Sequence, residues 1–98
     1  MTKRRSEIKQ WLAEVLSNNL KDISYRAFIF GSQANQLDML RADIDLGILS
    51  DHTIPSKYLM RINDAIEELP ILYKIDLVDF ANVDDRFKAA ALKNVEWL

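Results

Sequence analysis

YRAFIFGS at residues 25–32 and DIDLGIL at residues 43–49 are the two stretches that decide the fold of this chain. The first is short, aromatic and mostly apolar, which is typical of a buried strand, and Gly31-Ser32 ends it. The second alternates a carboxylate with an apolar residue and then continues apolar, which predicts a second strand. Residues 33–42 between them are mixed, and we expect a short helix followed by a loop there.

Apolar residues recur at helical spacing around these strands. Residues 6–20 form an amphipathic pattern with Ser6 as the expected N-terminal cap, and residues 56–69 form a second one. A third strand is predicted over residues 71–80, and a last helix over residues 84–93. This order of elements predicts an α/β (α+β) layer in which helices pack on a small sheet.

The size and charge of the chain exclude several classes of protein. Its 98 residues fit one domain, spanning 1–98, and its 49% hydrophobic residues allow a core. A net charge of -2 gives no positive field for nucleic acid, and the lack of cysteine excludes disulfides and thiolate metal sites. No segment reaches the roughly 20 apolar residues of a membrane span. We therefore expect a cytoplasmic protein that binds neither membrane nor nucleic acid.

Carboxylates stand where a strand usually carries neutral residues. Asp43 and Asp45 are two apart, so both side chains leave the same face of the second strand. Two such charges about 4–5 Å apart repel by roughly 3–4 kcal/mol at an effective dielectric near 20. A Mg²⁺ ion compensates that repulsion, because it prefers oxygen ligands. Asp76 joins the pair if the third strand neighbours the second, whereas Asp79 points to the other face and is expected to cap or pair locally.

Gly31-Ser32 follows the first strand directly and offers a phosphate cradle. Glycine lets the backbone approach a bulky anion, and a helix that starts after Ser32 attracts phosphate through its free N–H groups. Phosphoryl and nucleotidyl transfer need both parts, a positioned phosphate chain and a metal that neutralises the developing charge. Simpler interpretations stay open: a solvated strand edge for the Asp43 pair, and a surface acid beside Lys74 for Asp76.

These residues resemble a known signature. Phe30-Gly31-Ser32, ten intervening residues and Asp43-Ile44-Asp45-Leu46 resemble the motif of the minimal nucleotidyltransferases within the DNA polymerase beta-like superfamily. Ile75-Asp76-Leu77-Val78 resembles the third carboxylate strand of that family. The similarity covers residues 25–80 and implies a small mixed sheet flanked by helices, the polymerase beta-like nucleotidyltransferase fold.

The resemblance also implies an activity and a set of site residues. ATP or another nucleoside triphosphate is the implied donor, with two Mg²⁺ ions as cofactors. Gly31 and Ser32 are implied to bind the triphosphate, and Asp43, Asp45 and Asp76 to be the catalytic, metal-binding residues. Asp76 is further implied to activate the attacking hydroxyl as a general base.

Short members of this family act with a separately encoded helical partner of the HEPN type or the kanamycin-nucleotidyltransferase substrate-domain type. In such pairs the nucleotidyltransferase can be an antitoxin that attaches AMP to a tyrosine of a ribonuclease toxin. The implied function is therefore transfer of a nucleoside monophosphate to a hydroxyl on a partner protein or small molecule.

The chain departs from the family pattern beside the phosphate cradle. Gln33 stands where arginine is frequent, Asn35-Gln36 where a basic residue and glycine are common, and Ala42 where serine is common. Less positive charge at this point weakens triphosphate binding. The alternative is thus a catalytically weak or inactive nucleotide-binding or regulatory subunit that acts by binding a helical partner. Two other residues carry simple expectations: His52 is exposed, and Trp97 lies in a frayed tail or anchors a partner.

Overall fold

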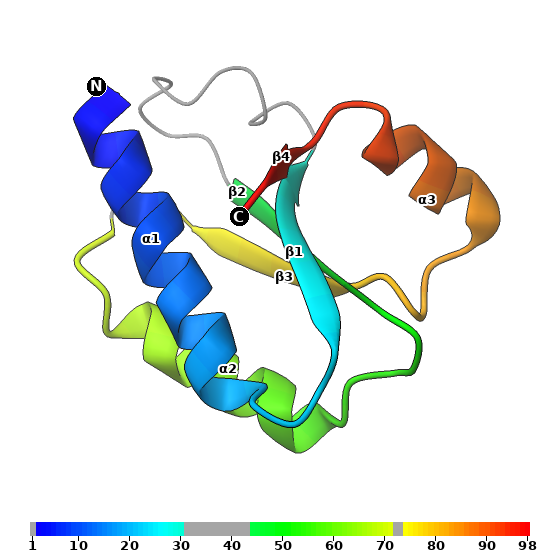
Figure 1. Ribbon diagram of the computed structural model, residues 1–98, viewed down its shortest axis with the longest axis horizontal. Helices are drawn as coiled ribbons and strands as arrows, with labels where there is room; N and C mark the ends of the chain where they lie inside the picture. The colour runs from blue at the N-terminus through cyan, green and yellow to red at the C-terminus, as the bar shows by residue number, and fades with distance from the viewer. Residues whose placement is uncertain (1, 31–43, 72–73) are drawn as a thin grey trace.

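The computed structural model of the chain describes residues 2–30, 44–71 and 74–98 (Figure 1). The elements are α1 (Thr2–Asn19), β1 (Tyr25–Phe30), β2 (Ile44–Ser50), α2 (Ser56–Glu67), β3 (Ile75–Asp79), α3 (Asp85–Leu92) and β4 (Glu96–Trp97). The expected order of helices and strands is confirmed, and β4 is an addition. The short helix and loop predicted over residues 33–42 lie outside the described residues.

The four strands form one mixed sheet in the order β3-β2-β1-β4. β1 pairs antiparallel with both β2 and β4, while β2 and β3 run parallel. Parallel neighbours need a crossover connection, and α2 supplies it between β2 and β3. Among the described helices, none is long and apolar enough to cross a membrane.

Helices α1 and α2 cover one face of the sheet (Figure 1). The inward side chains of β2 alternate along the strand and are buried against both helices. The buried side chains of this layer include Leu12, Leu16, Ile29, Ile44, Leu46, Ile48, Ile54 and Ile62. Helix α1 begins at Thr2, so the prediction that Ser6 caps it is wrong. The residues before Ser6 include lysine and arginine, which have high helix propensity, so the helix extends beyond Ser6 toward the N-terminus.

The opposite face of the sheet carries aromatic rings and is partly covered by α3. Phe28, Phe30 and Phe80 are buried together, and their ring centroids lie 4.9–5.8 Å apart. Gly47 lies beneath them in β2. A Cβ atom at this position would stand 2.6 Å from the Phe28 ring and 2.7 Å from the Phe80 ring. Glycine is therefore required here by the close approach of the rings to the backbone.

The short strand β4 joins the end of the described chain to the sheet. Trp97 pairs with Phe28 in register, and its ring lies 5.1 Å from the Phe28 ring. The Lys9 ammonium group donates to Glu96 at 2.8 Å, which ties β4 to α1. The expectation of a frayed tail at Trp97 is therefore wrong. A strand of two residues has no periodicity that sequence can reveal.

Candidate functional site

Asp45 and Asp76 lie side by side on neighbouring strands. They are register partners in the parallel pairing of β2 with β3, so their side chains leave the same face of the sheet. The backbone N–H of Ile44 donates to the carbonyl oxygen of Lys74 at 2.8 Å. This hydrogen bond continues the pairing to the ends of β2 and β3. The third strand does neighbour the second, which is the condition for Asp76 to join Asp45, and the roles of both residues stay predictions. Adjacent strands stand about 4.8 Å apart, so the two carboxylates can share one cation.

The Asp76 carboxylate stays accessible. Its Oδ1 lies 3.8 Å from the Lys74 ammonium group, and the two side chains are 42% and 73% exposed. An ion pair this long and this exposed stabilises little, about 0.2–1 kcal/mol in typical cases. Asp76 does contact Lys74, as the simpler interpretation expected. This weak contact leaves the Asp76 carboxylate open to another ligand.

Phe30 completes the row on the other side of Asp45. It pairs with Asp45 in the antiparallel register of β1 with β2, so Asp76, Asp45 and Phe30 lie in one line across three strands. The chain leaves β1 after Phe30 and enters β2 at Ile44, at this same end of the sheet. The predicted site residues Gly31, Ser32 and Asp43 lie outside the described residues, and their roles stay predictions.

The pair of carboxylates fits a hard divalent cation. Mg²⁺ is usually held by one or two carboxylates together with water and substrate oxygens. Within residues 2–30, 44–71 and 74–98, no group of three or more His, Cys, Asp or Glu side chains is placed to bind a metal. Asp45 and Asp76 are thus the described part of the predicted triad, and their oxygen ligands match the preference of Mg²⁺.

Asp79 lies outside this site, three residues beyond Asp76 in β3. It pairs with Ile48, whose side chain faces the helices, so it lies on the other face of the sheet. Its buried carboxylate accepts hydrogen bonds from the backbone N–H of Ile54 at 2.8 Å and of Ala81 at 3.0 Å. The expectation of a local role is confirmed, because Asp79 fastens two loops to the sheet. His52 is exposed, as expected.

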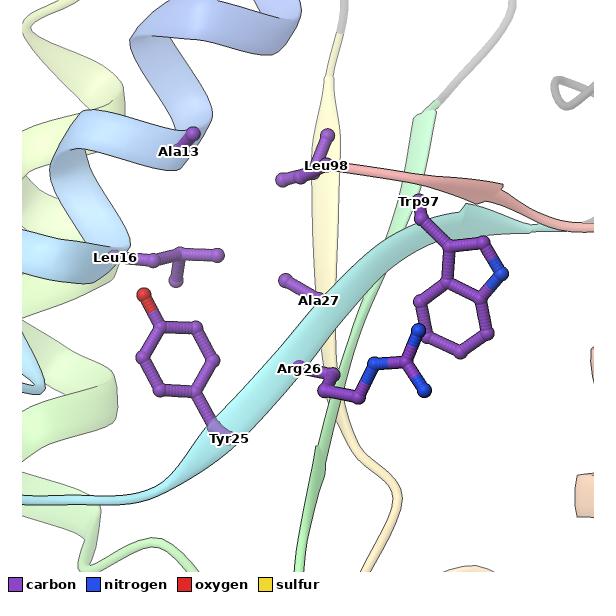
Figure 2. A pocket seen from close by; sticks show the side chains of 7 residues that line it. All are labelled: Ala13, Leu16, Tyr25, Arg26, Ala27, Trp97 and Leu98. Atoms are coloured by element: carbon purple, nitrogen blue, oxygen red, sulfur yellow. The ribbon is translucent and has the colours of Figure 1, made fainter.

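A pocket lies at the opposite end of β1, between that strand, α1 and β4 (Figure 2). Its volume is about 370 Å³, and Tyr25, Arg26 and Trp97 are among the residues that line it. The Arg26 guanidinium stacks over the Trp97 ring at 4.1 Å, and burial raises the pKa of the Tyr25 hydroxyl above its usual 10.0. The five steps along the strand from Tyr25 to Phe30 span about 17 Å, at roughly 3.3 Å each. This pocket is therefore separate from the carboxylates.

The fold and the site together define a class of protein. A small mixed sheet that presents paired carboxylates on one face, with helices on the other, is the architecture of a polymerase beta-like nucleotidyltransferase domain. The family model described as "Polymerase beta, Nucleotidyltransferase" matches residues 10–98. The chain belongs to this family, and the resemblance inferred from its motifs is confirmed.

Solved structures share this fold at low sequence identity. A crystal structure from Shewanella oneidensis has a TM-score of 0.68 and 17% identity, over 93% of this chain and 68% of that one. A toxin-antitoxin structure with AMP-PNP has a TM-score of 0.65 and 16% identity, over 90% and 69%. A complex of tri-AMPylated Shewanella oneidensis HEPN toxin with MNT antitoxin has a TM-score of 0.57 and 17% identity, over 88% and 64%. No curated protein matches the chain.

Proposed function

We propose that this chain is a metal-dependent nucleotidyltransferase that transfers AMP from ATP to a hydroxyl on a partner protein or small molecule. The observation that carries the proposal is the register pairing of Asp45 with Asp76 on one face of the sheet. Family membership supports nucleotidyl transfer as the reaction class. The choice of AMP rests on similarity of fold to a structure with AMP-PNP and to a complex with an AMPylated toxin.

Each proposed site residue has a role in the reaction. Gly31 and Ser32 bind the triphosphate, and Asp43, Asp45 and Asp76 hold Mg²⁺, which supplies positive charge against the phosphate oxygens. Asp76 takes the proton from the acceptor hydroxyl as general base. The acceptor oxygen then forms a bond to the α-phosphorus. The bond from that phosphorus to the bridging oxygen breaks, and pyrophosphate leaves with the electron pair.

The proposed acceptor is a separately encoded helical protein of the HEPN type, with this chain as the antitoxin of the pair in the cytoplasm. Several structures of similar fold are toxin-antitoxin complexes, among them one described as MntA-HpeT. The described part of the chain offers a mixed sheet whose β3 edge carries the accessible Asp76. A hydroxyl presented by a partner can therefore reach the carboxylate over that edge.

A second function is favoured by the residues beside the phosphate cradle. Gln33 and Asn35-Gln36 put no positive charge where the family commonly has it. A regulatory subunit that binds a nucleotide weakly, or that only occupies a helical partner, needs no such charge. In that case Asp43→Asn leaves neutralisation of the partner unchanged.

The test is an AMP-transfer assay with labelled ATP, Mg²⁺ and the product of the neighbouring gene as acceptor. An Asp43→Asn, Asp45→Asn double variant is compared with Asp64→Asn, which makes the same exchange at an exposed position of α2. The proposal expects label on the partner with the natural chain and with the Asp64 variant, and none with the double variant. ATP binding without label supports the regulatory subunit. Absence of both binding and label rejects nucleotide chemistry.

A further inference from the structure

We propose that Phe87 is the residue on which the base of the donor nucleotide stacks, and that it gives the site a preference for purines. This inference rests on the proposed function and extends it to the choice of donor. Phe87 lies in α3 and is 43% exposed, so part of its ring can contact a ligand. Base stacking on an exposed aromatic ring is a common mode of binding, because every base has a π-face.

The ring of Phe87 is held in place on one side. It stacks on Phe80 at 5.7 Å between centroids with an interplanar angle of 30°, and it meets Phe30 edge-on at 6.0 Å and 87°. Its backbone N–H donates to the carboxylate of Asp84, the N-cap of α3, at 2.7 Å. Phe80 packs against the ring, and the 43% exposure of the residue leaves part of the ring open to a ligand. This open part of the Phe87 ring is called the platform below.

The platform borders the row of carboxylates. Phe30, which contacts Phe87, is the register partner of Asp45, and one strand spacing of about 4.8 Å separates Phe30 from Asp45. Phe87 therefore contacts the ring of Phe30, and Phe30 is the neighbour of Asp45, the proposed catalytic carboxylate. A nucleotide with its phosphates at Asp45 can extend its base over this ring.

The order of strands assigns the platform to the donor rather than the acceptor. Asp76, the proposed base for the acceptor hydroxyl, lies in β3 at the edge of the sheet. Phe30 lies in β1, on the other side of Asp45. The donor thus enters on the side of β1, where Phe87 is, and the acceptor enters over β3.

The other exposed large apolar side chains in the described part of the chain are worse placed. Met60 is 65% exposed but belongs to α2, on the opposite face of the sheet. Trp97 is 38% exposed, but Arg26 covers one face of its ring and its register partner is Phe28, two residues before Phe30. Phe87 is therefore the exposed ring that borders the carboxylates.

Stacking on one ring predicts a graded preference among nucleotides. Purine bases overlap a phenyl ring over a larger area than pyrimidines do, so ATP and GTP should bind more tightly than CTP and UTP. The Phe87 ring offers area for stacking, but a phenyl group has no hydrogen-bond donor or acceptor that could distinguish one base from another. Preference from stacking strength alone discriminates modestly between bases.

The experiment measures binding by calorimetry in Mg²⁺ for ATP, UTP and tripolyphosphate, the last being a donor without a base. Phe87→Ala and Phe87→Trp are compared with the natural chain, and Met60→Ala is the matched control for loss of an exposed apolar side chain. We expect Phe87→Ala to weaken ATP binding about thirtyfold, the middle of the range for one stacked base, and to leave tripolyphosphate binding unchanged. Phe87→Trp should restore or tighten ATP binding, and Met60→Ala should change neither.

Two results overturn the inference, and they differ from each other. If Phe87→Ala binds ATP as tightly as the natural chain does, the ring does not hold the base, whether or not binding of the partner protein falls. If the natural chain binds neither ATP nor tripolyphosphate, the proposed function fails and this inference fails with it. Circular dichroism of Phe87→Ala should match that of the natural chain, so that weaker binding is not mistaken for unfolding of α3.

Discussion

Neutralising Asp76 should make the protein more stable in the absence of metal. Asp76→Asn removes one of two like charges that the pairing of β2 with β3 holds on neighbouring strands. Asparagine keeps the shape of the side chain, so packing changes little. Most surface substitutions alter stability by less than about 0.5 kcal/mol, so a clear gain at a polar position is an unusual result and a direct measure of the repulsion.

The structure sets the size of the gain. Carboxylates about 5 Å apart repel by about 3 kcal/mol at a dielectric near 20 and by about 0.8 kcal/mol in bulk water. The Asp76 side chain is 42% exposed, which places the repulsion toward the lower value, about 1–2 kcal/mol. Loss of the exposed Lys74 pair removes about 0.5 kcal/mol of stabilisation. The net gain is therefore about 1 kcal/mol, or about 4–8 °C in Tm for a domain of this size.

The assay is thermal unfolding followed by circular dichroism at low salt, with a chelator or with Mg²⁺. Without metal, Asp76→Asn should melt above the natural chain, and added salt should shrink the difference by screening. With Mg²⁺, the natural chain should gain stability and the variant should gain less, because a bound ion stabilises only a folded state that can hold it. Asp64→Asn, on the exposed face of α2, should follow the natural chain in both conditions.

A variant that melts below the natural chain without metal would refute the reasoning. The Asp76 carboxylate would then stabilise the fold, and its place beside Asp45 would be a structural pairing. An equal response of both proteins to Mg²⁺ would also contradict the assignment, because the ion would then bind elsewhere.

Three further predictions test the packing and the buried polar groups. Gly47→Ala should lower the free energy of unfolding by about 1–3 kcal/mol in urea, because its Cβ would stand 2.6 Å from the Phe28 ring, and an unchanged midpoint would contradict the packing. Asp79→Ala should destabilise by about 1–3 kcal/mol for each of the two backbone N–H groups left without an acceptor, and a loss below about 0.5 kcal/mol would show that water replaces it. Burial raises the pKa of Tyr25 above 10.0, so its stabilisation is complete below pH 10 and is lost as the pH rises through the folded-state pKa. Ultraviolet titration should show a phenolate that forms above pH 10 and that Tyr25→Phe removes, and a Tyr25 hydroxyl with its usual pKa of 10.0 would contradict its burial.

The strands were predicted well where the local pattern is strong. β1 runs from Tyr25 to Phe30 as expected, and β2 extends one residue past the expected end, to Ser50. Asp43, where the second strand was expected to begin, lies outside the described residues. The third strand was expected over 71–80 but is Ile75–Asp79, because its pairing with β2 begins at Ile44 and Ile75. The length of a strand depends on its partner, and local periodicity does not contain that partner.

The missed features depend on contacts between distant residues. β4 holds its place through the Trp97 ring against Phe28 and through the ion pair of Lys9 with Glu96. Neither contact leaves a local pattern in a strand of two residues. The aromatic platform at Phe87 was missed for the same reason, since the rings it contacts come from β1 and from Phe80, the residue that follows β3.

The two aspartates of β3 show what the alternation of side chains along a strand can and cannot decide. Parity alone separates Asp76 from Asp79, because residues three apart on a strand point to opposite faces. The strand order then places Asp76 beside Asp45, and packing gives Asp79 two backbone donors. The fold is therefore expected to depend on Asp79 and to be opposed by Asp76, because the like-charged neighbour of Asp76 should lower stability. In the proposed function a shared cation would offset that repulsion.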